Sequence, residues 1–164
     1  DGKRTLGKEP GITCTVNQNR PESKGSIHIK SNNPEEYPSI KYNFLSNSLD
    51  RDTLVAGVKL IRNIMQSKPM KEFCSDEIQP GMDFSSDANI LQFIRDKAET
   101  VYHPSGTCKM GFDKNAVVDK ELKVHGIKGL RIADASIMPT LISGNTNAAC
   151  MMIGERCADF IMHS

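Results

Sequence analysis

The sequence has no tryptophan, few aromatic residues and almost no net charge, and these absences exclude a class of partner. Aromatic residues make up 5% of the 164 residues. The chain has 21 Lys and Arg and 20 Asp and Glu, which gives a formal charge of +1. Proteins that bind nucleic acids need a basic surface, and those that bind single strands add aromatic stacking platforms. We therefore predict no nucleic-acid partner.

Long hydrophobic runs are also missing. No apolar stretch approaches the roughly 20 residues that cross a bilayer, and the first residues, Asp-Gly-Lys-Arg, are not followed by the apolar region of a signal peptide. Because the chain begins with Asp1 rather than Met, we expect it to be part of a longer protein. We expect that protein to be cytoplasmic or peripherally membrane-associated.

The five cysteines, at positions 14, 74, 108, 150 and 157, are odd in number and include no C-x-x-C pair. In a helix, Cys150 and Cys157 would lie about 10 Å apart along the axis, which is too far for a disulfide. Free thiols in a reducing compartment are the simpler interpretation.

Several motifs that carry chemistry are absent. No histidine is spaced from Cys, Asp or Glu as a metal ligand would be, and H-E-x-x-H does not occur, so we predict no metal site. The dinucleotide motif G-x-G-x-x-G, the P-loop and the G-x-S-x-G elbow are missing too, which disfavours a hydrolase and leaves the chain no phosphate cradle of its own.

The pattern of the first third predicts strands. Residues 12–16 and 25–30 alternate polar and apolar positions, and residues 38–44 place Ile40, Tyr42 and Phe44 on one face. A turn signal at 32–34 separates the last two segments. We predict an antiparallel meander with one solvated side, from which His28 faces solvent.

The period then changes to that of helices. Residues 50–67 have helical spacing of apolar residues, and Pro69 is expected to end this helix. A second amphipathic helix is predicted over residues 87–99, with a capping residue at its start.

The last third predicts two short strands, 122–124 and 130–133, joined through glycines. A final helix follows Gly144, and its apolar first half, around residues 148–153, predicts that this end is buried.

His103 is the first candidate for chemistry. The ring of Pro104 disfavours helical backbone at the preceding residue, so we expect an extended segment in which Val101 and His103 share a face and Tyr102 points the other way. Gly106 permits close approach of a ligand or of another backbone. A positioned histidine is the usual general base for a hydroxyl proton. Judged from the local pattern alone, a core histidine bonded to a carbonyl is the more frequent arrangement.

Two polar clusters follow. Asp134 comes directly after the predicted strand 130–133, where α/β proteins bind ligands, and it also fits a turn or cap aspartate. Residues 144–147 open the last helix, whose free N–H groups suit a negative charge on a ligand. Asn145 fits an ordinary helix cap as well.

Three of these stretches, in this order, resemble the C-terminal part of the glucose-methanol-choline (GMC) oxidoreductases. They are YHPSGTCKMG at 102–111, VHGIKGLRIADASIMP at 124–139 and GNTNAACMMIGERCAD at 144–159. With RPESKGSIHIKS at 20–31, the resemblance covers residues 12 to 162. It is greatest to the choline dehydrogenase branch of the family.

The resemblance implies roles for particular residues. His103 matches the histidine that takes the proton of the substrate hydroxyl, Asn145 matches its catalytic partner, and Tyr102 matches a position lining the substrate cavity. A further set matches residues that contact FAD: Asp134 and Ala135 along the dinucleotide, and Thr146 and Asn147 beside the isoalloxazine ring.

The resemblance also implies a fold and assigns two parts of the chain to different domains. We expect an α+β chain in which residues 1–115 form the substrate-binding part, an antiparallel sheet covered by helices. Residues 116–164 would return to the FAD-binding domain as a strand and a helix. The N-terminal FAD-binding domain is then the missing partner, and this chain alone is expected to retain FAD weakly or not at all. Cut from that domain, residues 124–162 would expose apolar surface and associate as a homo-oligomer.

The function implied is FAD-dependent oxidation of a small, choline-like alcohol. The hydroxyl proton goes to His103, and a hydride goes to the flavin N5 atom. The alternative is a non-catalytic module for substrate recognition or protein interaction.

Overall fold

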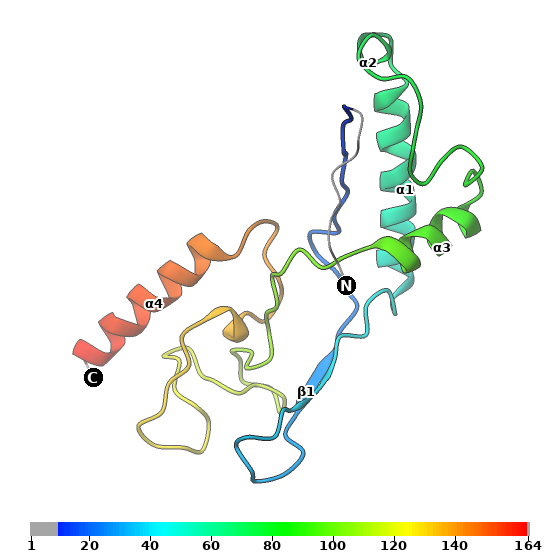
Figure 1. Cartoon of the computed structure of the whole chain (residues 1–164). Coiled ribbons are helices and arrows are strands. Elements are labelled where there is room, and N and C mark those ends of the chain that lie inside the picture. Colours follow the sequence, from blue (N-terminus) through cyan, green and yellow to red (C-terminus); the bar gives the residue numbers. More distant parts are fainter. Residues whose placement is uncertain (1–9, 164) are drawn as a thin grey trace. The chain divides into compact units, whose positions relative to one another are not determined.

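The computed structural model describes residues 10–163, which form two compact units. Unit 1 contains the described residues up to Gln18 together with Asn47–Ala98, and unit 2 contains Asn19–Ser46 with residues 99–163. Helices and a short antiparallel sheet confirm the predicted α+β class (Figure 1). These two units do not test the predicted boundary at residue 115, which stays a prediction.

Unit 1 is built on the predicted first helix, α1 (Ser48–Met65). Its N-terminus is capped by Asn47, whose side chain accepts the Leu49 N–H at 2.8 Å. Pro69 does not simply end α1, as expected, but lies in the first turn of the short helix α2 (Lys68–Lys71). Proline is tolerated there because the N–H groups of a first turn have no helical partner.

The second predicted helix is α3 (Asp87–Lys97), which lies beside α1 in Figure 1. Ser86 caps it by accepting the Asn89 N–H at 3.2 Å, so the serine before Asp87 is the capping residue. Ile90 and Ile94, four residues apart, are buried on one face. With Val55 of α1 they form the core of this unit.

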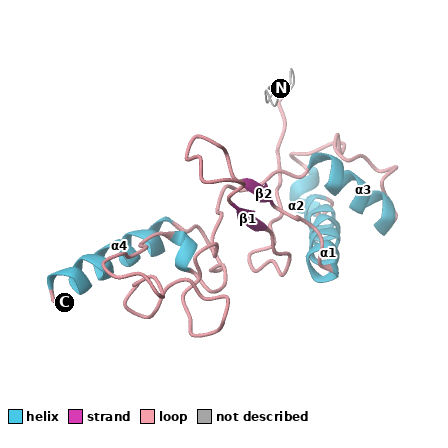
Figure 2. Ribbon diagram, turned by 90° about the horizontal axis from the view of Figure 1, so that it is seen from below, coloured by secondary structure: helices cyan, strands magenta, loops and turns pink. Residues whose placement is uncertain are grey.

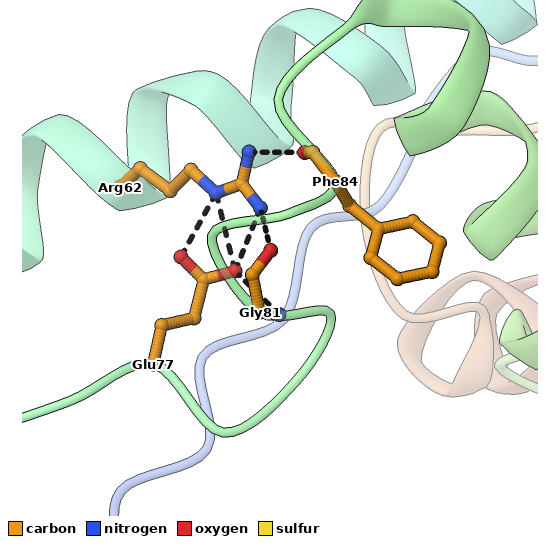
Figure 3. Close-up of polar contacts among 4 residues, drawn as sticks. All are labelled: Arg62, Glu77, Gly81 and Phe84. Atoms are coloured by element: carbon orange, nitrogen blue, oxygen red, sulfur yellow. Dashed lines mark hydrogen bonds and ion pairs between the residues drawn. The ribbon is translucent and has the colours of Figure 1, made fainter.

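The loop after α2 is held to α1 by a single arginine, Arg62, as Figure 3 shows. Its Nε and Nη2 atoms donate to the two carboxylate oxygens of Glu77 at 2.9 and 2.8 Å. Nη1 also donates to the Phe84 carbonyl at 2.7 Å and Nη2 to the Gly81 carbonyl at 3.0 Å. Because a guanidinium has several donors in a fixed plane, one side chain binds the loop at three residues, Glu77, Gly81 and Phe84.

The predicted strand at residues 12–16 is wrong. This segment lies on α1, where the Val16 side chain fills the space over Gly57 so closely that a Cβ at Gly57 would overlap it. Gln18 donates to the Thr53 hydroxyl at 3.4 Å. An alternating pattern becomes a strand only beside another strand, and both described strands belong to unit 2.

The sheet of unit 2 has two strands, β1 (Ser26–His28) and β2 (Ser39–Lys41), paired antiparallel with Ile27 opposite Ile40. The antiparallel pairing is confirmed, although each strand is shorter than predicted. His28 is exposed as predicted, but so are the apolar residues of the sheet, with Ile27 41% and Ile40 50% exposed. A two-stranded sheet of this size has little stability of its own.

The predicted strands at 122–124 and 130–133 occur only as single bridges, Val118 with Val124 and Lys123 with Arg131. Figure 2 accordingly shows most of this region as loop. The pairing is limited to two bonds, from the Val124 N–H to the Leu130 carbonyl at 3.0 Å and from the Ile132 N–H to the Leu122 carbonyl at 3.1 Å. Beside it, Asp119 forms a turn in which its Oδ1 accepts the N–H groups of Glu121 at 2.8 Å and Lys123 at 2.9 Å.

The last helix, α4 (Asn147–Met162), closes the core of unit 2. Ile153 and Cys157 pack with the buried side chains Val118, Leu122, Ile137 and Met138. The prediction that the first half of this helix is buried was too broad, because Met151 and Met152 are exposed and only one stripe is covered.

All five cysteines are free thiols. Over residues 10–163, no helix has both the length and the apolar composition that a membrane span requires.

The turn at Asp119 is expected to depend on pH. Burial raises the pKa of this carboxyl. The N–H groups of Lys123 and Glu121 and the charges of Lys123 and His125 lower the pKa by more than burial raises it, so the pKa lies below its ordinary value. A depressed pKa stabilises the folded turn above the unfolded-state pKa of about 3.9, and this stabilisation is lost as pH falls through the folded pKa.

An NMR titration of the Glu121 and Lys123 amides checks this expectation. In the wild type both resonances should shift as Asp119 is protonated, below about pH 4. The chains compared, with and without Asp119→Asn, both carry Glu121→Gln, because the hydrogen bond from Lys123 lowers the pKa of the Glu121 carboxyl into the same range and its protonation would move the same amides. In this background Asp119→Asn keeps an oxygen acceptor and removes the charge, so the step should vanish. A step that persists in Asp119→Asn would contradict the assignment.

Candidate active site

His103 is set on a backbone that differs from the expected extended one. Tyr102 has a φ of 61°, in the left-handed region that residues other than glycine rarely adopt. Its N–H donates to the Thr100 hydroxyl at 3.1 Å, which holds the turn. The predicted sharing of one face by Val101 and His103 therefore does not hold. Tyr102 is exposed and His103 is half-buried.

The segment after His103 runs beside the residues that follow Asp134. The Gly106 N–H donates to the Ala135 carbonyl at 3.2 Å, and the Met110 N–H donates to the Ile137 carbonyl at 2.7 Å. Gly106 has a φ of 81°, and a Cβ there would lie 3.2 Å from the Met138 carbonyl oxygen. The close approach permitted by this glycine is therefore, in this structure, that of another backbone.

His103 also contacts the third motif. Its Nδ1 lies 3.0 Å from the hydroxyl oxygen Oγ1 of Thr146. Thr146 is 9% exposed and stands at the N-terminal end of α4, which its side chain does not cap. The resemblance implied a position for Thr146 beside the isoalloxazine ring, but no pattern in the sequence indicated a bond to His103.

The neighbours of Thr146, Asn145 and Asn147, are both exposed. The first turn of α4 carries no acidic residue and no side-chain cap, and the space around Gly144 is open enough for a Cβ without contact. The N–H groups of such a helix end are suited to a negative charge on a ligand. This matches the expectation for residues 144–147 without testing the role of each residue.

Asp134 is found as a cap. Its Oδ1 accepts the Ser136 N–H at 2.7 Å at the start of the short helix η1 (Ala135–Ile137), while the residue itself is exposed. The cap interpretation is thus observed, and the ligand interpretation remains a prediction, since an exposed carboxylate can still accept a hydroxyl.

One residue near the site was missed by the sequence interpretation. The Arg20 Nε donates to the Ser143 hydroxyl at 2.5 Å, which ties the start of unit 2 to the loop before α4. Arg20 lies in the RPESKG stretch, but nothing in that stretch indicates its partner. Within residues 10–163, no three His, Cys, Asp or Glu side chains are grouped as a metal site.

Comparison with known proteins identifies the class. The GMC oxidoreductase C-terminal family model matches residues 21–154, and the chain belongs to the GMC oxidoreductases. Oxygen-dependent choline dehydrogenase of Escherichia coli is 44% identical over 94% of this chain, which spans 27% of that relative.

Solved structures agree with this assignment. Pyridoxine 4-oxidase from Mesorbium loti superposes with a TM-score of 0.82 at 32% identity, over 89% of this chain and 28% of its own. Formate oxidase from Aspergillus oryzae gives a TM-score of 0.78 at 34% identity, over 87% of this chain and 25% of its own. The chain thus corresponds to about a quarter of the length of each relative.

Proposed function

We propose that this chain supplies the catalytic C-terminal part of an FAD-dependent dehydrogenase of a small, choline-like alcohol. The observation that carries the proposal is the contact of His103 with Thr146, 3.0 Å between Nδ1 and Oγ1. It places a half-buried imidazole at the N-terminal end of α4. A base beside a helix end that suits negative charge is what alcohol oxidation needs.

The residues present fit FAD in chemical terms. Asp134 offers an exposed carboxylate of the kind that binds ribose hydroxyls, and Ala135 adjoins it. The open N-terminus of α4, with Thr146 and Asn147, suits the negative charge that the isoalloxazine ring carries when it is reduced. When bound, FAD supplies the hydride acceptor, its N5 atom.

The chain's own residues then move the proton and position the substrate. The Nε2 atom of His103, the ring nitrogen that does not contact Thr146, accepts the proton of the substrate hydroxyl. The Asn145 amide donates a hydrogen bond to the same substrate oxygen. Tyr102, exposed on its left-handed turn, lines the cavity and contributes to the choice of alcohol.

We further propose that an FAD-binding domain covers the exposed apolar side chains of unit 2. Met151, Met152 and Met162 of α4 and Ile29 beside β1 are between 57% and 85% exposed. Exposed apolar surface of this kind favours an interface. In the isolated chain the same surface would drive association with a second copy.

Reconstitution tests this function. The chain is mixed or co-expressed with the N-terminal FAD-binding part of the Escherichia coli choline dehydrogenase, and anaerobic loss of flavin absorbance is followed on adding choline, pyridoxine or an aryl alcohol. We expect a yellow complex that choline reduces, and light scattering should change from self-associated chain to a defined complex.

Two outcomes would count against the proposal. A complex that holds FAD but is reduced by none of these alcohols would favour the non-catalytic module. A strictly monomeric isolated chain would contradict the expected self-association through α4.

A further inference from the structure

We propose that Thr146 is a positioning residue that accepts a hydrogen bond from the Nδ1–H of His103 and thereby leaves Nε2 unprotonated for the substrate. The inference rests on the proposed function, in which His103 is the base. Its starting point is the 3.0 Å separation between His103 Nδ1 and Thr146 Oγ1. This separation admits either hydrogen-bond direction, because a hydroxyl both donates and accepts.

The chemistry of the base selects the direction. A neutral imidazole carries one proton, and the hydrogen bond made by one nitrogen sets the state of the other. If Thr146 donated to Nδ1, the proton would lie on Nε2, and His103 could not take another there. If Thr146 accepts from Nδ1–H, Nε2 has a free lone pair directed away from Thr146.

The state after proton transfer requires the same arrangement. An imidazolium donates from both nitrogens, so Oγ1 of Thr146 must then be an acceptor. When Oγ1 accepts from the outset, the hydroxyl does not have to turn during the reaction, and the site is preorganised. The proton moves from the substrate oxygen to Nε2, and the bond at Nδ1 is unchanged.

Both partners are held firmly enough for this role. His103 is fixed between the left-handed turn at Tyr102, φ 61°, and the restricting ring of Pro104. Thr146 is buried at the start of α4, and no capping bond competes for its hydroxyl. The hydrogen bond to Thr146 therefore joins two residues whose positions are already restricted.

Nitrogen NMR of the chain tests the direction without any enzymatic activity. Long-range proton–nitrogen correlations distinguish the two neutral tautomers of each histidine, and the same spectrum contains two references. His125 Nε2 lies 3.0 Å from the Gly111 carbonyl, and His163 Nδ1 lies 2.9 Å from the Asp159 carbonyl. A carbonyl only accepts, so these two neutral rings must be protonated on Nε2 and Nδ1 respectively.

We expect neutral His103 to show the His163 pattern, protonated on Nδ1. Thr146→Val keeps the shape and removes the hydroxyl, so both tautomers should become populated, whereas Thr146→Ser should keep the wild-type pattern. A wild-type His103 with the His125 pattern, or a tautomer unaffected by Thr146→Val, would overturn the inference.

The reconstituted enzyme gives a second readout. Thr146→Val should lower kcat roughly 10- to 100-fold, in the range for partners that orient a functional histidine, with KM nearly unchanged. Thr146→Ser should stay within about threefold of wild type, since it restores the hydroxyl. Full kcat in Thr146→Val would refute the positioning role. A reconstituted protein without alcohol activity would instead refute the proposed function. The tautomer measurement would then decide the inference about Thr146 by itself.

Discussion

Replacing His103 with Ala is expected to lower kcat for alcohol oxidation by the reconstituted enzyme about 10²- to 10⁴-fold, the usual contribution of a general base. The reason is that no other described titratable side chain is bonded to the site residues Asn145, Thr146 or Asn147. Rapid mixing with choline, followed by flavin absorbance, measures the reductive step directly. The remaining rate should rise with pH, because the alcohol must then lose its proton to water or hydroxide.

His28→Ala is the matched control for this variant. His28 belongs to the same unit, is exposed on β1 and has no place in the proposed site. It should reduce flavin at the wild-type rate. Undiminished reduction by His103→Ala, with both variants folded by circular dichroism, would remove His103 as the base and leave the histidine in a structural role.

The parts of the fold that follow from local pattern were predictable. α1 and α3 lie within two residues of their predicted bounds, because helical periodicity and the capping residues Asn47 and Ser86 act over a few neighbours. Strands depend on partners distant in sequence, and the pattern at residues 12–16 looked the same whether a strand or a helix lay beside it. The predicted pairing of residues 122–124 with 130–133 is reduced to a single bridge, beside a turn held by the Asp119 side chain.

The site divides in the same way. The order of three motifs was enough to predict the family and to name His103 as a candidate base. The glycine and asparagines at residues 144–147 were enough to predict the start of α4. The contact between His103 and Thr146 joins positions 43 residues apart and has no local signature. The left-handed backbone of Tyr102 was missed for a related reason, because a bulky aromatic residue gives no sign of a positive φ.

No pattern in the sequence indicated the contacts of Arg62 with the loop after α2. Replacing this residue is expected to have the largest effect on stability. Arg62→Ala removes the paired bonds to Glu77 and the bonds to two loop carbonyls, and leaves the Glu77 carboxylate without its counter-charge. The two side chains are only 13% and 21% exposed, so water replaces these bonds poorly. We expect a loss of about 2 to 3 kcal/mol in the free energy of unfolding, measured by urea denaturation.

Lys59→Ala is the matched control, since it also removes a cation from α1 and introduces the same residue, alanine, which favours the helix. Its ion pair with Asp87 joins side chains that are 47% and 71% exposed, and exposed pairs contribute less than about 1 kcal/mol. Amide exchange locates the effect, because the Gly81 N–H donates to Glu77 at 3.2 Å and should lose protection in Arg62→Ala only. Equal losses of stability in the two variants would mean that the helix, and not the loop that Arg62 holds, limits the stability of unit 1.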